Sequence, residues 1–170
     1  MSEGLDPIDE SRRQWMLRGW DDAAEGMTLV ISVMRVHQLF LARVDRVLRP
    51  LSLTFSRYEV LALLSFTRRG SLPMNKITKR LQVHATSTTN SVDRLEAAGL
   101  ARRLPHPEDG RTTLVEITES GRELVARATD ALNSQVFRQA GLAPEQVRDM
   151  LASVSQLRAF LEESTSDPAG

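Results

Sequence analysis

The stretch 77–118 constrains the fold of this chain more than any other part of its sequence. A short amphipathic segment at 75–81 and a three-residue turn precede a second helical segment, 86–98, which Gly99 ends. Two β-prone segments follow, at 100–104 and 113–118. They enclose a cluster of turn-forming residues: Pro105, Pro107, Asp109 and Gly110. This order predicts a helix-turn-helix that runs directly into a β-hairpin.

Amphipathic helices account for most of the remaining chain. In the predicted helix 26–48 the apolar stripe is wider than one core requires, which indicates two burial partners, one of them a second subunit. For the helix 57–67, Ser56 is the expected N-cap and Glu59 completes a capping box. Its expected core residues are Val60, Leu61, Leu63, Leu64 and Phe66. The fold class predicted is mainly α with a small β-wing: a winged helix-turn-helix domain plus long terminal dimerisation helices.

The predicted organisation has four parts. Residues 1–25 form a partly disordered N-terminal extension that carries Trp15 and Trp20. Two segments, 26–50 and 119–163, form a helical dimerisation region. The winged helix-turn-helix DNA-binding region is 51–118, and 164–170 is a disordered tail.

Composition narrows the class of protein. The net charge is zero, which counts against a nucleic-acid binder, yet the basic residues concentrate in the middle third of the chain. No cysteine is present, which excludes disulfides, thiol-based redox sensing and Cys-ligated zinc. The N-terminus is acidic, and no apolar run reaches the roughly 20 residues of a membrane span. We therefore expect a cytoplasmic protein with no membrane association.

The second helix of the pair has a polar face. Thr86 and Asn90 lie on one stripe of it, and Ser87, Asn90 and Arg94 lie on an overlapping one. Asn side chains can bond adenine and threonine methyls can contact thymine, whereas Arg94 suits a phosphate. By itself such a face is typical of any solvated amphipathic helix. The hairpin that follows favours the DNA interpretation, because Arg111 at its tip can enter a minor groove. Asp109, two residues away, can hydrogen-bond the turn backbone or orient a nearby guanidinium. By itself, Asp109-Gly110-Arg111 is also typical of an ordinary polar hairpin turn.

The chain resembles the MarR family of dimeric winged-helix regulators. The resemblance rests on these residues: Asp93-Arg94-Leu95-Glu96, Gly99-Leu100, Arg103, Pro105, Asp109-Gly110-Arg111, Val115 and Ile117-Thr118. It implies a homodimer on a pseudo-palindromic double-stranded DNA site and release by a small aromatic, anionic or acyl-thioester effector. By position it implies that Arg111 is the wing-tip residue and that the major-groove residues are Thr86, Ser87, Thr89 and Asn90.

Four positions depart from the family pattern: Gln82, His84, Thr88 and Gly110. Because of the first two, either His84 or Thr86 is expected to cap the second helix. Thr88 occupies a position where an apolar inward residue is usual. Gly110 removes one cation from the wing. These changes concern the docking of the helix and the wing and leave the predicted architecture intact.

For the effector, the ligand-binding candidates are His37, Tyr58 and Trp20. No two of the three histidines lie at i+3 or i+4 spacing and none belongs to a metal-like cluster, so we expect neither a metal nor a cofactor. The sequence also has no nucleophile motif and no phosphate cradle, so an enzyme is not expected. The alternative to a DNA-binding regulator is a winged-helix protein-interaction module that does not bind DNA.

Overall fold

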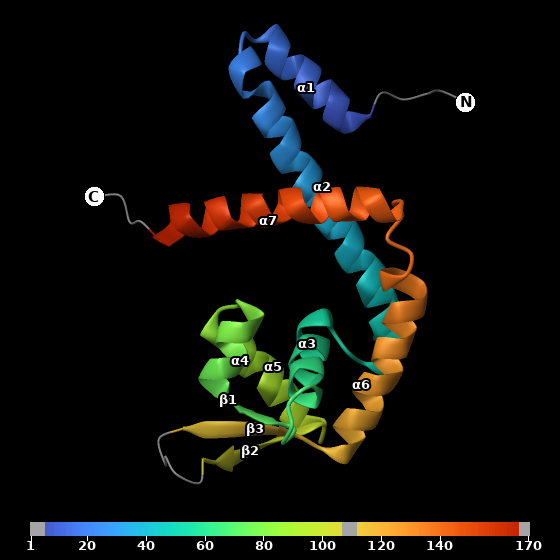
Figure 1. Cartoon of the computed structure of the whole chain (residues 1–170), viewed down its shortest axis with the longest axis vertical. Coiled ribbons are helices and arrows are strands. Elements are labelled where there is room, and N and C mark those ends of the chain that lie inside the picture. Colours follow the sequence, from blue (N-terminus) through green and yellow to red (C-terminus); the bar gives the residue numbers. More distant parts are fainter. Residues whose placement is uncertain (1–5, 107–111, 167–170) are drawn as a thin grey trace. The chain divides into compact units, whose positions relative to one another are not determined.

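The structure is a computed structural model that describes residues 6–106 and 112–166. In chain order its elements are α1 (Pro7–Leu17), α2 (Asp21–Leu48), η1 (Arg49–Leu51), α3 (Phe55–Ser65), β1 (Ser71–Pro73), α4 (Met74–Leu81), α5 (Ala85–Ala97), β2 (Ala101–Pro105), β3 (Thr113–Ile117), α6 (Glu119–Leu132), η2 (Asn133–Phe137) and α7 (Pro144–Ser166) (Figure 1). Two compact units make up the chain, Met1–Thr129 and Asp130–Gly170. The mainly helical architecture with a small β-wing is the one predicted.

The core of the first unit lies where α3, α4 and α5 meet the sheet. Its buried side chains come from every one of these elements: Val60, Leu61, Leu64, Ile77, Val92, Leu95, Ala101, Val115 and Ile117. The helices contribute residues three or four positions apart, as a helical stripe requires, and the strands contribute alternate residues. This core fixes the position of α5 relative to the hairpin.

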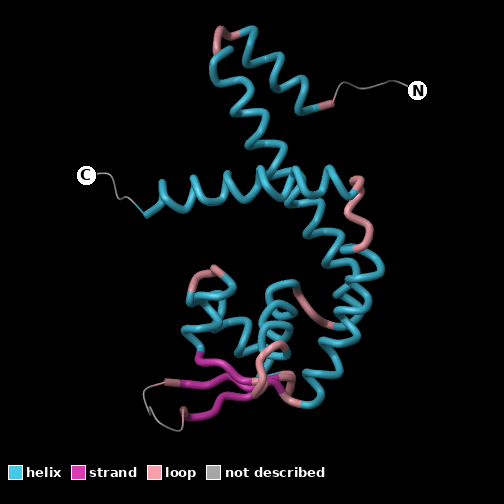
Figure 2. The backbone as a smooth tube through the Cα atoms, in the orientation of Figure 1, coloured by secondary structure: helices cyan, strands magenta, loops and turns pink. Residues whose placement is uncertain are grey.

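The sheet has three antiparallel strands in the order β1-β3-β2 (Figure 2). The short strand β1 pairs with β3, with Leu72 opposite Val115. The hairpin strand β2 pairs with the other edge of β3, with Arg102 opposite Glu116. The short strand β1 is therefore the third strand of the wing sheet.

The N-terminal helices differ from the predicted ones. Asp6 caps α1 by accepting a hydrogen bond from the N–H of Ile8 at 2.8 Å, so the extension predicted to be partly disordered is helical over Pro7–Leu17. The helix α2 begins at Asp21 and not at Gly26, because Asp21 and Asp22 place negative charge in its first turn. The helices α1 and α2 pack against each other as a hairpin (Figure 1). Where they join, Trp15 and Trp20 make an edge-to-face contact at 5.2 Å.

The helix α3 also differs in detail. Its N-cap is Thr54, whose hydroxyl accepts from the N–H of Arg57 at 3.4 Å, so the expected Ser56–Glu59 capping box is wrong. Thr54 and Ser56 both carry a hydroxyl group that could cap a helix. Thr54 makes the cap because the helix whose buried side packs in the core begins directly after it, at Phe55. Phe66, expected in the core, is 80% exposed because the helix ends before it.

The start of α6 is held close to the turn between α5 and β2. Thr118 donates from its hydroxyl to the carbonyl of Gly99 at 2.8 Å, and Ser120 does so at 3.1 Å. A methyl group on Gly121 would overlap the carbonyl oxygen of Leu100. Only glycine permits this close approach of two backbone segments.

The second unit contains one π-helical turn, η2, followed by α7. Much of the apolar surface of α7 is exposed. The large exposed apolar residues of this helix are Met150, Leu151, Val154, Phe160 and Leu161. A helix with this much exposed apolar surface indicates a partner.

One segment, Asp21–Leu51, is long and apolar enough to cross a membrane by length and composition, with a mean hydropathy of 1.3 over its most apolar window. The expectation that no segment reaches this level is wrong by that measure. A helix that packs against another protein surface passes the same test, so length and composition alone do not make this segment a membrane span.

Candidate nucleic-acid interface

The helices α4 and α5 form the predicted helix-turn-helix (Figure 1). In α4, Ile77 is fully buried, whereas Lys76, Lys79 and Arg80 are exposed. Gln82 adopts a left-handed conformation, with φ 53°, and ends α4. His84 is then extended and α5 starts at Ala85. The left-handed turn, usually assigned to glycine, is thus made here by glutamine.

The inward side of α5 is not wholly apolar. Val92 and Leu95 are fully buried as predicted, and Thr88 and Ser91 are buried with them. The Thr88 hydroxyl donates to the carbonyl of His84 at 3.4 Å, which satisfies a polar group inside the core. Neither His84 nor Thr86 caps the helix with its side chain in the structure, contrary to expectation.

The outward side of α5 carries the predicted DNA contacts. Every side chain of this helix named from the sequence for that role is exposed: Thr86, Ser87, Thr89, Asn90 and Arg94. The structure brings them together on one helix whose opposite side is anchored in the core. Their role in DNA binding stays a prediction.

An ion-pair network joins α5 to the wing. The Arg103 guanidinium on β2 pairs with Asp93 at 2.6 Å and with Glu96 at 2.5 Å, both on α5. The backbone N–H of Arg103 also donates to Glu96 at 3.0 Å. This hydrogen bond, followed by that of the guanidinium, lowers the pKa of Glu96 below its ordinary value. We call these three residues the Arg103 clamp. All three belong to the pattern that suggested the family, but nothing in their spacing indicates that they pair.

The paired part of the wing hairpin can be followed to the ends of β2 and β3. The hairpin stays paired as far as His106, whose N–H donates to the carbonyl of Thr112 at 3.1 Å. Asp109 and Arg111 lie outside the described residues, so their predicted wing-tip roles remain predictions.

The basic residues of the middle third are not equivalent. Arg103 is held in the clamp, and Arg102 pairs with Glu116 across the hairpin at 2.5 Å. These two cations are largely neutralised and cannot contribute a full charge to a DNA-facing surface. Within 6–106 and 112–166, Arg94 takes part in no ion pair. Arg94 therefore has its charge available for a phosphate.

The three effector candidates do not form one pocket. Tyr58 is buried, stacks on Phe55 at 6.2 Å and shares a hydrogen bond with Thr129 at 3.1 Å, which gives it a packing role. His37 is exposed on α2. Trp20 directly precedes the first residue of that helix, about 25 Å from His37 at the rise of an α-helix, which is too far for both to touch one small ligand.

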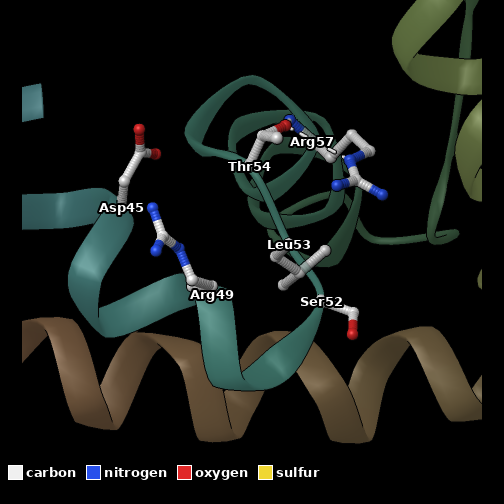
Figure 3. Close-up of a pocket in the computed structure, with 6 residues that line it drawn as sticks. All are labelled: Asp45, Arg49, Ser52, Leu53, Thr54 and Arg57. Atoms are coloured by element: carbon white, nitrogen blue, oxygen red, sulfur yellow. Dashed lines mark hydrogen bonds between the residues drawn. The ribbon is translucent and has the colours of Figure 1, made fainter. Parts of the chain in front are cut away.

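A hollow of about 410 Å³ does lie between the end of α2 and the start of α3 (Figure 3). It is lined by Asp45, Arg49, Ser52, Leu53, Thr54 and Arg57. Sequence reasoning missed this site. The signal available in the sequence was a pair of arginines around the helix break at Pro50: Arg49 directly before it and Arg57 in the next helix.

No group of three or more His, Cys, Asp or Glu side chains able to hold a metal occurs in the part of the chain that the structure describes.

Comparison with known proteins agrees with this geometry. The MarR family model matches residues 53–113. The HTH-type transcriptional repressor IacR of Pseudomonas putida is 30% identical over 116 residues, which are 67% of this chain and 68% of that protein. The crystal structure of Sco5413, a MarR family transcriptional regulator from Streptomyces coelicolor, is 42% identical with a TM-score of 0.73, covering 82% of this chain and 96% of that one.

A further solved structure is similar over most of the chain. Sco3205, a MarR family transcriptional regulator from Streptomyces coelicolor solved in complex with DNA, is 25% identical with a TM-score of 0.69 and covers 85% of this chain and 90% of that one. These relatives are transcriptional regulators, and none indicates an enzyme family. The chain belongs to the MarR family of DNA-binding transcriptional regulators.

Proposed function

We propose that the protein is a homodimeric, sequence-specific repressor that acts in the cytoplasm on an imperfect palindrome and releases DNA when it binds a small effector. The observation that carries this proposal is the exposed polar side of α5, anchored by its buried side and joined to the wing by the Arg103 clamp. A recognition helix must be rigid relative to its second contact for both to bind one duplex. Repression is supported by the name of the IacR relative.

The residues are proposed to divide the task by their chemistry. Thr86, Ser87, Thr89 and Asn90 face the major groove, where short polar side chains reach base edges. Arg94 contacts a phosphate. Arg111 enters the adjacent minor groove, with Asp109 orienting it.

Dimerisation is supported by exposed apolar surface on the terminal helices. On α2 this surface consists of Leu29, Val30, Ile31, Val33, Met34, Val36, Leu39 and Phe40. Exposed apolar patches of this size on a folded chain mark an interface. We propose that 26–50 and 119–163 supply the dimer contacts and that 51–118 binds DNA. The two recognition helices then lie about 34 Å apart, one turn of the duplex.

For the effector, we propose the hollow between α2 and α3 in place of the three residues named from the sequence. Arg49 and Arg57 favour an anion, and Leu53 offers an apolar contact for an aromatic ring. An effector releases DNA only if it prefers the conformation that does not fit the operator. The alternative of an interaction module without DNA binding is not favoured, because the chain belongs to a family of DNA-binding regulators.

Footprinting on the DNA upstream of the protein's own gene tests this proposal. The expected result is protection of an imperfect inverted repeat. If neither that DNA nor a genomic library yields a protected repeat, the protein is not a sequence-specific regulator.

A further inference from the structure

A second hollow, of about 340 Å³, opens between the start of α3 and the exposed side of α5. Its lining residues come equally from the two regions: Thr54, Ser56 and Arg57 from the first, and Asn90, Ser91 and Arg94 from the second. All six side chains can donate a hydrogen bond, and none is acidic. We call this hollow the α3–α5 seat.

The positive charges of the two arginines of the seat are not compensated by a paired carboxylate among the described residues. In 6–106 and 112–166, neither Arg57 nor Arg94 forms an ion pair, whereas Arg102 and Arg103 on the nearby hairpin are both bound to carboxylates. The Arg57 guanidinium donates to the Thr54 hydroxyl at 3.2 Å, a neutral partner. Figure 3 shows it turned away from Asp45 and Arg49, which lie across the neighbouring hollow. Two uncompensated guanidinium groups in one concave surface favour a bound anion.

The position of Arg57 is unfavourable for the helix itself. It lies in the first turn of α3, three residues after the Thr54 cap. A cation there faces the positive end of the helix dipole. The local cost of this placement is offset when an anion occupies the seat.

We propose that the α3–α5 seat binds one backbone phosphate of the DNA duplex that α5 reads. This inference rests on the proposed function and adds a contact from α3, a helix outside the helix-turn-helix. Asn90 lines the seat and also lies on the proposed base-reading face, so the phosphate held here flanks the bases in the major groove. A contact to phosphate sets the register of the recognition helix and carries no sequence information.

The test uses full-length protein and a duplex selected by it from a random library. A set of duplexes, each with one phosphate replaced by a neutral methylphosphonate, is titrated with wild type, Arg57→Ala and Arg94→Ala. We expect one phosphate per half-site whose neutralisation weakens binding by wild type. Neutralising the same phosphate should not weaken binding by Arg57→Ala or by Arg94→Ala any further. Arg57→Ala also lowers the slope of log K against log salt by about one unit per protomer and weakens selected and random duplexes by the same factor.

Two controls separate this result from misfolding. Arg127→Ala removes an exposed arginine of α6 that lines neither hollow, and is expected to leave affinity and slope unchanged. Arg57→Lys keeps the charge and is expected to retain most of the slope. Alanine also suits a helix better than arginine at the positive end of the dipole, so Arg57→Ala keeps the thermal midpoint.

Each other outcome overturns the seat. If Arg57→Ala is weakened by methylphosphonate at every phosphate that matters for wild type, no shared seat exists. The same holds if Arg57→Ala and Arg94→Ala become insensitive to the replacement at different phosphates. If inorganic phosphate raises the thermal midpoint of wild type but not of Arg57→Ala, and the duplex scan shows no position, the hollow takes free anion only. If wild type selects no sequence, the proposed function fails first, and the seat fails with it.

Discussion

Arg103 on β2 and Asp93 on α5 form an ion pair with 2.6 Å between Nη2 and Oδ1. Together with Glu96, this pair joins the outer side of the recognition helix to the first strand of the wing. The helix α5 and the hairpin, which are the two proposed DNA contacts, are thereby held together. Several measurable properties of the protein depend on this arrangement.

Arg103→Ala is expected to lower the free energy of unfolding by about 1 kcal/mol, the magnitude of a partly exposed ion pair. Its effect on DNA affinity is expected to be larger, because the wing is no longer fixed relative to α5. Denaturant unfolding and fluorescence anisotropy with a selected duplex measure the two effects. Arg102→Ala is the matched control, since Arg102 pairs only within the hairpin. Equal losses of DNA affinity in both variants would contradict a specific role for the clamp.

The clamp also predicts a pH dependence. The hydrogen bonds from Arg103 hold the pKa of Glu96 below its ordinary value of 4.5. A carboxylate with a lowered folded-state pKa stabilises the fold fully above its unfolded pKa, and this contribution is lost as the pH falls through the folded value. The difference in unfolding free energy between wild type and Glu96→Gln should therefore be constant near neutral pH and shrink below pH 4.5. A difference that stays constant throughout an acid titration would show that the clamp does not form.

Gly121→Ala is expected to destabilise the protein by about 1–3 kcal/mol, because the added methyl group overlaps the Leu100 carbonyl. Gly26→Ala is the matched control. Nothing lies within 4 Å of its added methyl group, and in the interior of α2 alanine is expected to raise stability by about 0.4–1 kcal/mol. Thermal unfolding of both variants checks the signs. A neutral Gly121→Ala would mean that α6 starts further from the turn.

Met34→Glu tests the dimer. This side chain is 60% exposed on the apolar side of α2, and a charge buried there in a dimer costs about 3–5 kcal/mol. Light scattering should then give the mass of one chain, 19.0 kDa, in place of twice that mass for wild type. Phe66→Glu adds the same charge at a side chain that is 80% exposed and lies outside 26–50 and 119–163, and this variant should remain dimeric. A monomeric wild type would overturn the proposed dimer.

Much of the fold was predictable because periodicity and turn chemistry are local. The buried stripe of α5, with Val92 and Leu95, followed directly from spacing, and Gly99 adopts the expected left-handed conformation. Helix ends were less predictable, since Thr54 and Ser56 are equally good caps by residue type and only the register of the core selects Thr54. Similarly, the residues next to Phe66 in the sequence do not indicate whether it lies before or after the end of the helix, and therefore whether it is buried.

The candidate site was predictable only where it lies on one helix. Of the exposed residues of α5, helical spacing was enough to name Thr86, Ser87, Asn90 and Arg94, and the family resemblance added Thr89. The Arg103 clamp and the α3–α5 seat join residues from different elements, and which side chains meet there depends on strand register and helix packing. For the same reason, the effector candidates His37 and Trp20 could not be recognised as distant from each other until the length of α2 was known.

The central claim is that the exposed side of α5 reads DNA sequence, and in vitro selection tests it most directly. Wild type should enrich an imperfect inverted repeat from random duplexes. Asn90→Ala should enrich the same repeat but lose its preference at one symmetric pair of positions, a loss of about 1–3 kcal/mol of discrimination per base pair. If wild type enriches no repeat, or if Asn90→Ala weakens all duplexes equally with its preferences intact, the recognition helix does not act as described.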